Sequence, residues 1–443
     1  MFDETDIFRR GQEYLKKKEY EQAAQTFSEA ISANPKYIEA YFSRGNAYEA
    51  LGQFDQAIES YNAVLKFAPK EAAVYFNRAC VYRKKGENDR ALSELNRAID
   101  IKPDYGKAYY NRGLLFFSQG NVTKAVADYE KAVEHSPQDP DPLVAMGLLC
   151  IVKSEPKKAI EYYDKALEID PKNVRAHGNR GNAMELLGKF QEAIDEYTNV
   201  TQLTRSDYKA YMNRGYVYSK INDHEKALAD YSRAIELNPK YSKAYCSRGA
   251  VYALLKRAQK ALEDYDEAIR LSPGNYEAYI SRGQAKMSLG DNIGGLDDFN
   301  FVLKKDATHF KALLNRGAAY TKMGNSDEAI KAYTEVIQCQ PNNPAAYSYR
   351  GALFSKTNQL DKAVADFNKV IELDQKYVSA YFNLGLIYRI QGKFKMALQN
   401  FTQTIKLDPK HLAAYKNRSA TYGMIGDTAN AEKDLQTVAK LEK

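Results

Sequence analysis

The sequence contains no tryptophan, few cysteines and no long run of apolar residues. Its four cysteines, Cys80, Cys150, Cys246 and Cys339, lie far apart and lack the spacings of a zinc site or a disulfide scaffold. No run reaches the roughly 18 apolar residues of a membrane helix, and the acidic N-terminus, MFDETDIFRR, does not match a signal peptide. We therefore expect a cytoplasmic protein that requires no metal, cofactor or membrane.

The sequence also has little excess charge of either sign, because 64 Lys and Arg residues against 57 Asp and Glu residues leave a net charge of only +7. Nucleic-acid binding needs a concentrated basic patch or a known module, so the sequence does not favour a nucleic-acid partner. Motifs of metalloproteases, α/β-hydrolases and phosphate-binding loops are absent, and the five histidines are isolated from one another. We expect no enzymatic activity.

A regular period is what the sequence does have. Prolines recur in one phase of 34 residues, at Pro35, Pro69, Pro103, Pro137, Pro171, Pro239, Pro273, Pro341 and Pro409. Other residues fill the missing positions without shifting the phase, so that thirteen intervals of 34 residues occupy positions 2–443. A period of this size indicates a repeat architecture in which each unit is one supersecondary element.

Each interval carries a small residue, usually glycine, and twelve residues later an alanine in all but one interval. Gly45 and Ala57 are examples, and a large apolar residue, here Tyr61, follows that alanine by four positions. Small side chains allow two helices to approach closely, so these positions mark a helix crossing. Between them lie turn residues suited to positive φ, such as Gly52 and Asn222.

This pattern resembles the tetratricopeptide repeat, on Tyr41, Gly45, Tyr48, Ala57, Tyr61 and Pro69 and their equivalents along the whole chain. The resemblance implies an all-α fold in which antiparallel pairs of helices, A and B, stack into a right-handed superhelical solenoid with helix A lining a concave groove. One domain is expected over residues 2–443. Its repeats would span 2–35, 36–69, 70–103, 104–137, 138–171, 172–205, 206–239, 240–273, 274–307, 308–341, 342–375, 376–409 and 410–443.

Arginine stands before the small residue in eleven repeats, and in eight of these an acid follows sixteen positions later. An arginine ladder is open to interpretation as an anion track, but the co-occurrence with acids favours ion pairs that join helix A to helix B. We expect structural pairs of this kind at Arg112 and Asp128, Arg214 and Asp230, Arg248 and Asp264, and Arg282 and Asp298.

Short polar residues recur two positions before the small residue, where the family implies a place in the groove. The expected peptide-binding residues of this type are Asn77, Asn111, Asn179, Asn213, Ser247, Asn315, Asn383 and Asn417. They resemble the asparagine ladder in the arm of O-linked N-acetylglucosamine transferases, which holds the backbone of an extended polypeptide. An amide suits this role because it donates and accepts hydrogen bonds at once.

Basic residues stand four positions earlier on the same helical face. They are Lys107, Arg175, Lys209, Lys243 and Lys311. This stripe favours acidic partner segments, although ordinary solvated lysines are the alternative, and acids at Glu39, Asp141 and Glu277 interrupt it. A co-chaperone clamp is disfavoured because Phe42, Phe76 and Tyr110 occupy the places where it needs lysine.

Repeat 138–171 is atypical, with Pro140 and Pro142 at the start of helix A, Met146 for arginine and Ser154 at the turn. A bend near residues 137–156 and a merely drifted repeat are both compatible with these changes.

The resulting hypothesis is a non-catalytic scaffold or adaptor that binds extended, acidic segments of other proteins in its groove. Alternatives are a targeting arm of a larger enzyme, since the chain begins and ends at a repeat boundary, a co-chaperone-like peptide binder and, least favoured, a nucleic-acid-binding sleeve. Self-association through uncapped terminal repeats is also left open.

Overall fold

The computed structural model describes residues 3–442, and all regular structure in this range is helical. Its helices form two compact units, one ending at Ile221 and one beginning at Asn222, which are described separately. The helices of the first unit are α1 (Glu4–Lys16), α2 (Tyr20–Ala33), α3 (Ile38–Ala50), α4 (Phe54–Phe67), α5 (Ala72–Lys84), α6 (Asn88–Ile101), α7 (Gly106–Ser118), α8 (Val122–His135), α9 (Asp141–Val152), α10 (Pro156–Ile169), α11 (Val174–Leu186), α12 (Phe190–Leu203) and α13 (Tyr208–Lys220).

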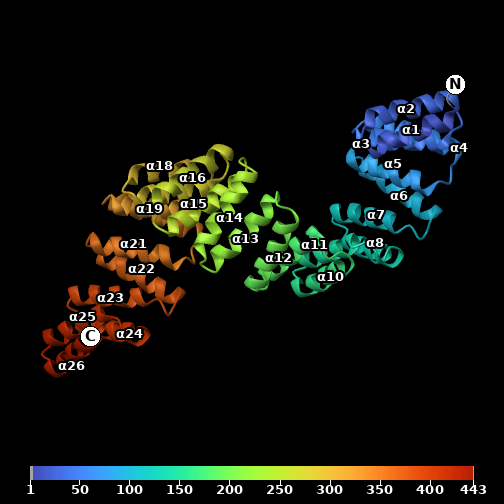
Figure 1. The fold of residues 1–443 in the computed structure, drawn as a ribbon. Helices are drawn as coiled ribbons and strands as arrows, with labels where there is room; N and C mark the ends of the chain where they lie inside the picture. Colours follow the sequence, from blue (N-terminus) through green and yellow to red (C-terminus); the bar gives the residue numbers. More distant parts are fainter. Residues whose placement is uncertain (1–2, 443) are drawn as a thin grey trace. The chain divides into compact units, whose positions relative to one another are not determined.

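The second unit is likewise a succession of helices (Figure 1). Its helices are α14 (His224–Leu237), α15 (Ser242–Leu254), α16 (Ala258–Leu271), α17 (Tyr276–Ser288), α18 (Asn292–Lys305), α19 (Phe310–Lys322), α20 (Ser326–Cys339), α21 (Pro344–Lys356), α22 (Leu360–Leu373), α23 (Val378–Ile390), α24 (Phe394–Leu407), α25 (Leu412–Met424) and α26 (Thr428–Leu441). Odd-numbered helices are helix A of each repeat and even-numbered helices are helix B.

Local chemistry sets where the helices begin and end. Several B helices start behind a side-chain cap, as in α8, where the Asn121 side chain accepts a hydrogen bond from the Lys124 backbone N–H. The turn after helix A passes through the left-handed region, and the predicted turn residues Gly52 and Asn222 adopt φ values of 72° and 62°. That part of the prediction is confirmed.

The small residue in helix A leaves a space that a large side chain from helix B of the same repeat fills. A Cβ atom added to Gly45 would lie 2.5 Å from Cε1 of Tyr61, whose side chain is fully buried. Gly385 and Phe401 repeat this contact in the second unit, again at 2.5 Å. Glycine is therefore required because an aromatic ring occupies the space that any other side chain would take.

Within each unit the helices pack in the order of the sequence, each against its neighbours. Successive A helices also contact each other directly, as α1 does α3 and α15 does α17, whereas the described B helices have no comparably close contact with one another. The A helices therefore form the more closely spaced layer, which places them on the inside of the curve within each unit. Interpretation of residues 2–443 as one domain of thirteen repeats stays a prediction, and positions 2 and 443 lie outside the described residues.

The atypical repeat is packed continuously with its neighbours. Helix α9 begins at Asp141, holds Pro142 in its first turn and buries Met146 where other repeats have arginine. Ser154 takes the left-handed turn conformation with φ of 61°. Because α9 contacts α8, α10 and α11, and the division between the units falls at Ile221 and Asn222, these observations favour a drifted repeat over a joint at 137–156.

Candidate functional site

The arginine before the small residue joins the two helices of its repeat. Arg112 on α7 donates from Nε and Nη2 to the two carboxylate oxygens of Asp128 on α8, at 2.8 and 2.7 Å. The Asp128 side chain is only 6% exposed. These hydrogen bonds, which are the largest cause, raise the pKa of Arg112 above its ordinary value. The planar guanidinium is suited to such a two-pronged contact.

The same two-pronged contact recurs in the second unit, where the pairs are Arg248 with Asp264, Arg282 with Asp298, Arg350 with Asp366 and Arg418 with Asp434. Arg214 and Asp230 lie in different units, and their pairing stays a prediction. Within the first unit, Arg214 Nη1 donates to the hydroxyls of Thr198 and Thr201.

A third contact of these arginines was not predicted from the sequence. Arg112 Nη1 donates to Asn96 Oδ1 on α6 at 2.8 Å, and Arg282 Nη1 donates to Asp266 Oδ1 on α16 at 2.7 Å. Each acceptor lies sixteen residues before its arginine, on helix B of the preceding repeat. These arginines therefore link consecutive repeats by hydrogen bonds. The signal was present in the sequence as a recurring polar residue at that distance.

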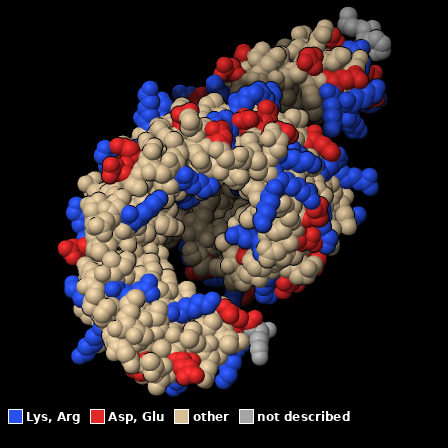
Figure 2. Space-filling model, turned by 90° about the vertical axis from the view of Figure 1, so that its left-hand side faces the viewer, with Lys and Arg blue, Asp and Glu red and all other residues tan. Residues whose placement is uncertain are grey.

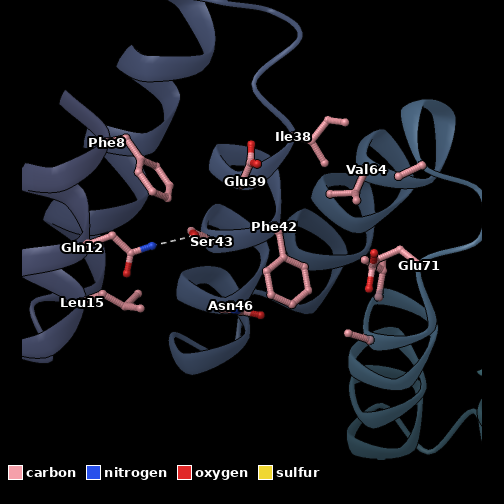
Figure 3. Close-up of a pocket in the computed structure, with 13 residues that line it drawn as sticks. Phe8, Gln12, Leu15, Ile38, Glu39, Phe42, Ser43, Asn46, Val64 and Glu71 are labelled. Atoms are coloured by element: carbon pink, nitrogen blue, oxygen red, sulfur yellow. Dashed lines mark hydrogen bonds between the residues drawn. The ribbon is translucent and has the colours of Figure 1, made fainter. Parts of the chain in front are cut away.

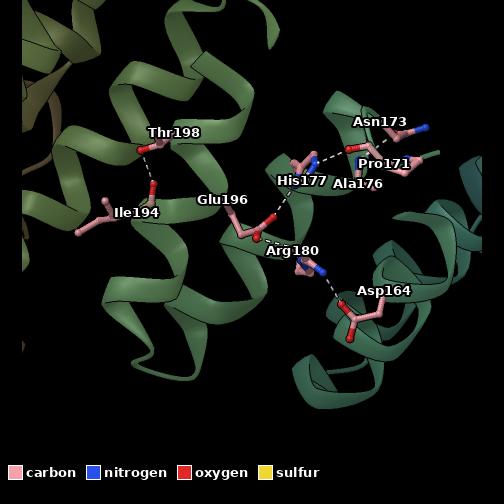
Figure 4. Close-up of polar contacts among 9 residues, drawn as sticks. All are labelled: Asp164, Pro171, Asn173, Ala176, His177, Arg180, Ile194, Glu196 and Thr198. Atoms are coloured by element: carbon pink, nitrogen blue, oxygen red, sulfur yellow. Dashed lines mark hydrogen bonds and ion pairs between the residues drawn. The ribbon is translucent and has the colours of Figure 1, made fainter. Parts of the chain in front are cut away.

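The first unit also contains a buried polar cluster that the sequence reasoning missed (Figure 4). His177 on α11 contacts Glu196 Oε2 through Nδ1 at 2.7 Å and the Pro171 carbonyl through Nε2 at 3.0 Å. Arg180 Nη2 donates to the other Glu196 oxygen at 2.7 Å, and its Nη1 pairs with Asp164 on α10. A histidine that was isolated in sequence is thus part of the junction between three helices.

The predicted peptide-binding residues of the first unit lie on A helices at corresponding positions. They are Asn77 on α5, Lys107 and Asn111 on α7, Arg175 and Asn179 on α11, and Lys209 and Asn213 on α13. The asparagines are half-buried and the basic side chains are exposed. Part of the amide capacity is used internally, because Asn111 Nδ2 donates to the Lys107 carbonyl and Asn77 Nδ2 donates to Asn46 Oδ1.

The second unit repeats this arrangement. Its predicted residues are Lys243 and Ser247 on α15, Lys311 and Asn315 on α19, Asn383 on α23 and Asn417 on α25. Asn315, Asn383 and Asn417 each donate Nδ2 to a carbonyl four residues earlier. Each of these amides keeps a second N–H and at least one oxygen lone pair for a further partner, and the Asn315 oxygen already accepts a hydrogen bond from Gln284 Nε2 at 2.9 Å.

Two of the basic residues are already paired with acids of the preceding A helix. Arg175 Nη2 lies 3.4 Å from Asp141 Oδ1, and Lys311 Nζ lies 2.5 Å from Glu277 Oε1. Lys107, Lys209 and Lys243 form no ion pair within residues 3–442. Of the five basic residues in this stripe, three lysines therefore keep a charge that no acid within residues 3–442 pairs with.

A pocket of about 610 Å³ shows which surface of helix A is hollowed (Figure 3). Helix α3 contributes Glu39, Phe42, Ser43 and Asn46 to its lining. We call the surface formed by these four positions, and by their equivalents at intervals of 34 residues, the helix A face. Lys107 and Asn111 are the equivalents of Glu39 and Ser43, so the predicted peptide-binding residues belong to this face.

Basic and acidic side chains are interspersed, with uncharged surface between them, on the face of the molecule that Figure 2 shows. Within the described residues no group of His, Cys, Asp and Glu is arranged to hold a metal ion. None of the described helices combines the length and the apolar composition needed to traverse a bilayer.

Comparison with solved structures finds many similar chains. Cut9–Hcn1 of the APC/C hetero-tetramer is 14% identical with a TM-score of 0.48, and 94% of this chain aligns with 96% of that one. Yeast Tom70 is 17% identical with a TM-score of 0.46, covering 90% of this chain and 99% of that one. YrrB, described as a TPR protein with an unusual peptide-binding site, is 24% identical with a TM-score of 0.35, covering 42% and 95%. A sequence comparison with curated proteins finds no significant match.

Family models match along both units. A tetratricopeptide repeat model matches residues 208–241, 242–275, 310–343 and 378–411, and a second matches 8–72 and 76–140. A TPR repeat model matches 155–188 and 356–388, and a further tetratricopeptide model matches 332–365. The chain therefore belongs to the tetratricopeptide repeat family, whose members serve in general as protein-interaction scaffolds.

Proposed function

We propose that this protein is a non-catalytic scaffold or adaptor that binds extended, acidic segments of partner proteins along the helix A face. The observation that carries the proposal is the arrangement on α7 and α13. Lys107 and Lys209 are exposed and form no ion pair with the residues that the structure describes, and each stands one helical turn from the amide of Asn111 or Asn213.

The two kinds of side chain serve different steps of binding. An amide can donate to a peptide carbonyl and accept from a peptide N–H, so it holds a backbone whatever side chains the segment carries. An exposed lysine attracts an acidic segment before contact and remains partly solvated afterwards, so its main effect is on the association rate. Screening by salt weakens this attraction.

The proposal is tested with two sets of substitutions in the first unit. One set replaces Asn111, Asn179 and Asn213 by alanine, and the other is the pair Lys107→Glu and Lys209→Glu. A matched control reverses the charge of Lys157 and Lys165, which are exposed on the B helix α10. Partners captured from cell extract by the unsubstituted chain are measured against each variant at low and high salt.

We expect charge reversal on helix A to slow association mainly at low salt, and amide removal to speed dissociation at both salt concentrations. The control pair should bind as the unsubstituted chain does. The proposal is wrong if the helix A variants bind normally while Lys157→Glu and Lys165→Glu lose the partner, because binding then lies on helix B.

A further inference from the structure

The sign of the charge on the helix A face changes within the first unit. Glu39 on α3 stands at the position that Lys107 occupies on α7. Glu71, at the start of α5, is a second acid in the lining of the same pocket, which contains no lysine or arginine. Burial is the largest cause that raises the pKa of Tyr37, and Glu39 and other nearby acids raise it further, as a negative potential around Tyr37 would.

Acids at this position elsewhere have a cation on the following A helix. Asp141 is paired with Arg175, and Glu277 is paired with Lys311. In both cases the base follows the acid by 34 residues, at the equivalent position of the next repeat. The fold therefore brings these two positions within ion-pairing distance whenever the side chains are complementary.

Glu39 lacks this partner because the residue 34 positions later is Ala73. Neither Glu39 nor Glu71 forms an ion pair within the part of the chain that the structure describes, and both are exposed. Ala73 itself lines the pocket beside the two acids. The lining of the pocket therefore contains two exposed carboxylates for which residues 3–442 provide no paired cation.

Most of the other residues that line the pocket are apolar. Phe8 and Leu15 of α1 lie on one side, Val64 of α4 lies on the other, and Phe42 lies between them (Figure 3). Val74 of α5 also lines the pocket. The volume of about 610 Å³ is within the range of pockets that enclose small ligands or side chains. Gln12 and Asn46 add polar groups to the lining, and Gln12 Nε2 donates to Ser43 Oγ at 2.9 Å.

We propose that this pocket binds a partner segment in which a large apolar side chain stands next to lysine or arginine. The apolar side chain would contact Phe42 and its neighbours, while the cation would lie beside Glu39 and Glu71. The inference rests on the proposed function, since it names a specific site on the helix A face. It also gives the bound segment a direction, with its basic part at α3 and its acidic part at α7.

The test uses the full chain and short labelled peptides in fluorescence anisotropy. The probe contains Phe between two Lys residues in a Gly-Ser background, and matched peptides carry Glu in place of Lys or Ala in place of Phe. We expect the probe to bind more tightly than either matched peptide. The double variant Glu39→Gln and Glu71→Gln should weaken probe binding about twofold to thirtyfold, as expected for two partly exposed ion pairs.

Ala73→Lys is the more discriminating variant. It introduces a lysine at the position equivalent to Lys311, so that this lysine can pair with Glu39 as Lys311 pairs with Glu277. It should remove the preference for the Lys-containing peptide, whereas Ala73→Ser should leave that preference unchanged. Glu161→Gln, which removes an exposed acid from the B helix α10, is the control for charge. Circular dichroism checks that every variant is folded.

Equal binding of the Lys and Glu peptides, or a preference that survives both Glu39→Gln with Glu71→Gln and Ala73→Lys, would overturn the inference. The proposed function would still stand if the Asn111, Asn179 and Asn213 substitutions released captured partners. Loss of partner binding only in the Glu39 and Glu71 variant would instead support the pocket and contradict the role of the amides.

Discussion

Removing one member of the Arg248 and Asp264 pair should destabilise the second unit, and removing both should destabilise it by less than the sum of the two single losses. Arg248 donates to the two Asp264 oxygens at 2.9 and 2.7 Å, and its Nη1 donates to Ser232 Oγ at 3.0 Å. The Asp264 side chain is 7% exposed and that of Arg248 is 21% exposed. The perturbations are Arg248→Leu, Asp264→Leu and the double change.

The two single changes should differ in size because the charges they leave differ in exposure. Arg248→Leu leaves a buried carboxylate without a cation, which costs about 3–5 kcal/mol. Asp264→Leu leaves a guanidinium that keeps Ser232 and some water, so we expect about 1–3 kcal/mol. The double variant buries two apolar side chains and should be less destabilised than the sum by about 1–3 kcal/mol.

The pH dependence follows from the same geometry. Hydrogen bonding to Asp264 raises the pKa of Arg248, so the pair contributes stability below the ordinary arginine pKa and loses it only in strong alkali. Unsubstituted protein should therefore lose none of this contribution between about pH 5 and pH 9.

The assay is urea unfolding followed by circular dichroism for all four chains, compared as a double-mutant cycle. Repeat arrays can unfold in stages, so the comparison uses the transition that the substitutions shift. Additive losses would show that Arg248 and Asp264 do not stabilise each other and would refute the reasoning.

Three further predictions concern single positions. On α11, Gly178→Ala should stabilise by up to about 1 kcal/mol, since the nearest atom outside the helix backbone is 3.9 Å from the added Cβ. Gly181→Ala should destabilise by about 1–3 kcal/mol, because a buried tyrosine ring lies 2.8 Å from the added Cβ. The urea midpoints should move in opposite directions, and equal shifts would contradict the packing. Lys256 has φ of 57°, so Lys256→Gly should stabilise the chain by about 1 kcal/mol and raise the urea midpoint, and a lower midpoint would rule out strain there. Burial, the largest cause, raises the pKa of the Cys80 thiol to about 11. Iodoacetamide at about pH 8 should therefore label the exposed Cys339 well before Cys80, and the labelling of Cys80 should rise as the pH approaches 11. Equal labelling by mass spectrometry at the lower pH would contradict this order.

Features that repeat in phase could be predicted from the sequence. The position of Gly45 beside Tyr61 and the left-handed turn at Gly52 follow from local rules, because a notch needs a small residue and positive φ favours glycine. Lys256 was not predicted as such a turn residue, because its conformation is imposed by the helices on either side rather than by its own preference.

Contacts between repeats were harder to predict. The link from Arg112 to Asn96 requires the stacking of one repeat on the next, which spacing within a single repeat does not specify. The pairing of Arg175 with Asp141 has the same origin, and it reduces the basic stripe that the sequence suggested. The pocket at Phe42 depends on three consecutive repeats and could not be predicted from any one of them.

The central claim is that partner segments lie on the helix A face, and site-specific photocrosslinking tests it most directly. A benzophenone side chain is placed at Tyr110, the α7 equivalent of Phe42, or at Glu130, which is exposed on the B helix α8. Irradiation in cell extract should attach partner segments to position 110 and leave position 130 unlabelled. Crosslinks from position 130 with none from position 110 would contradict the account, because the partner would then bind the outer layer of helices.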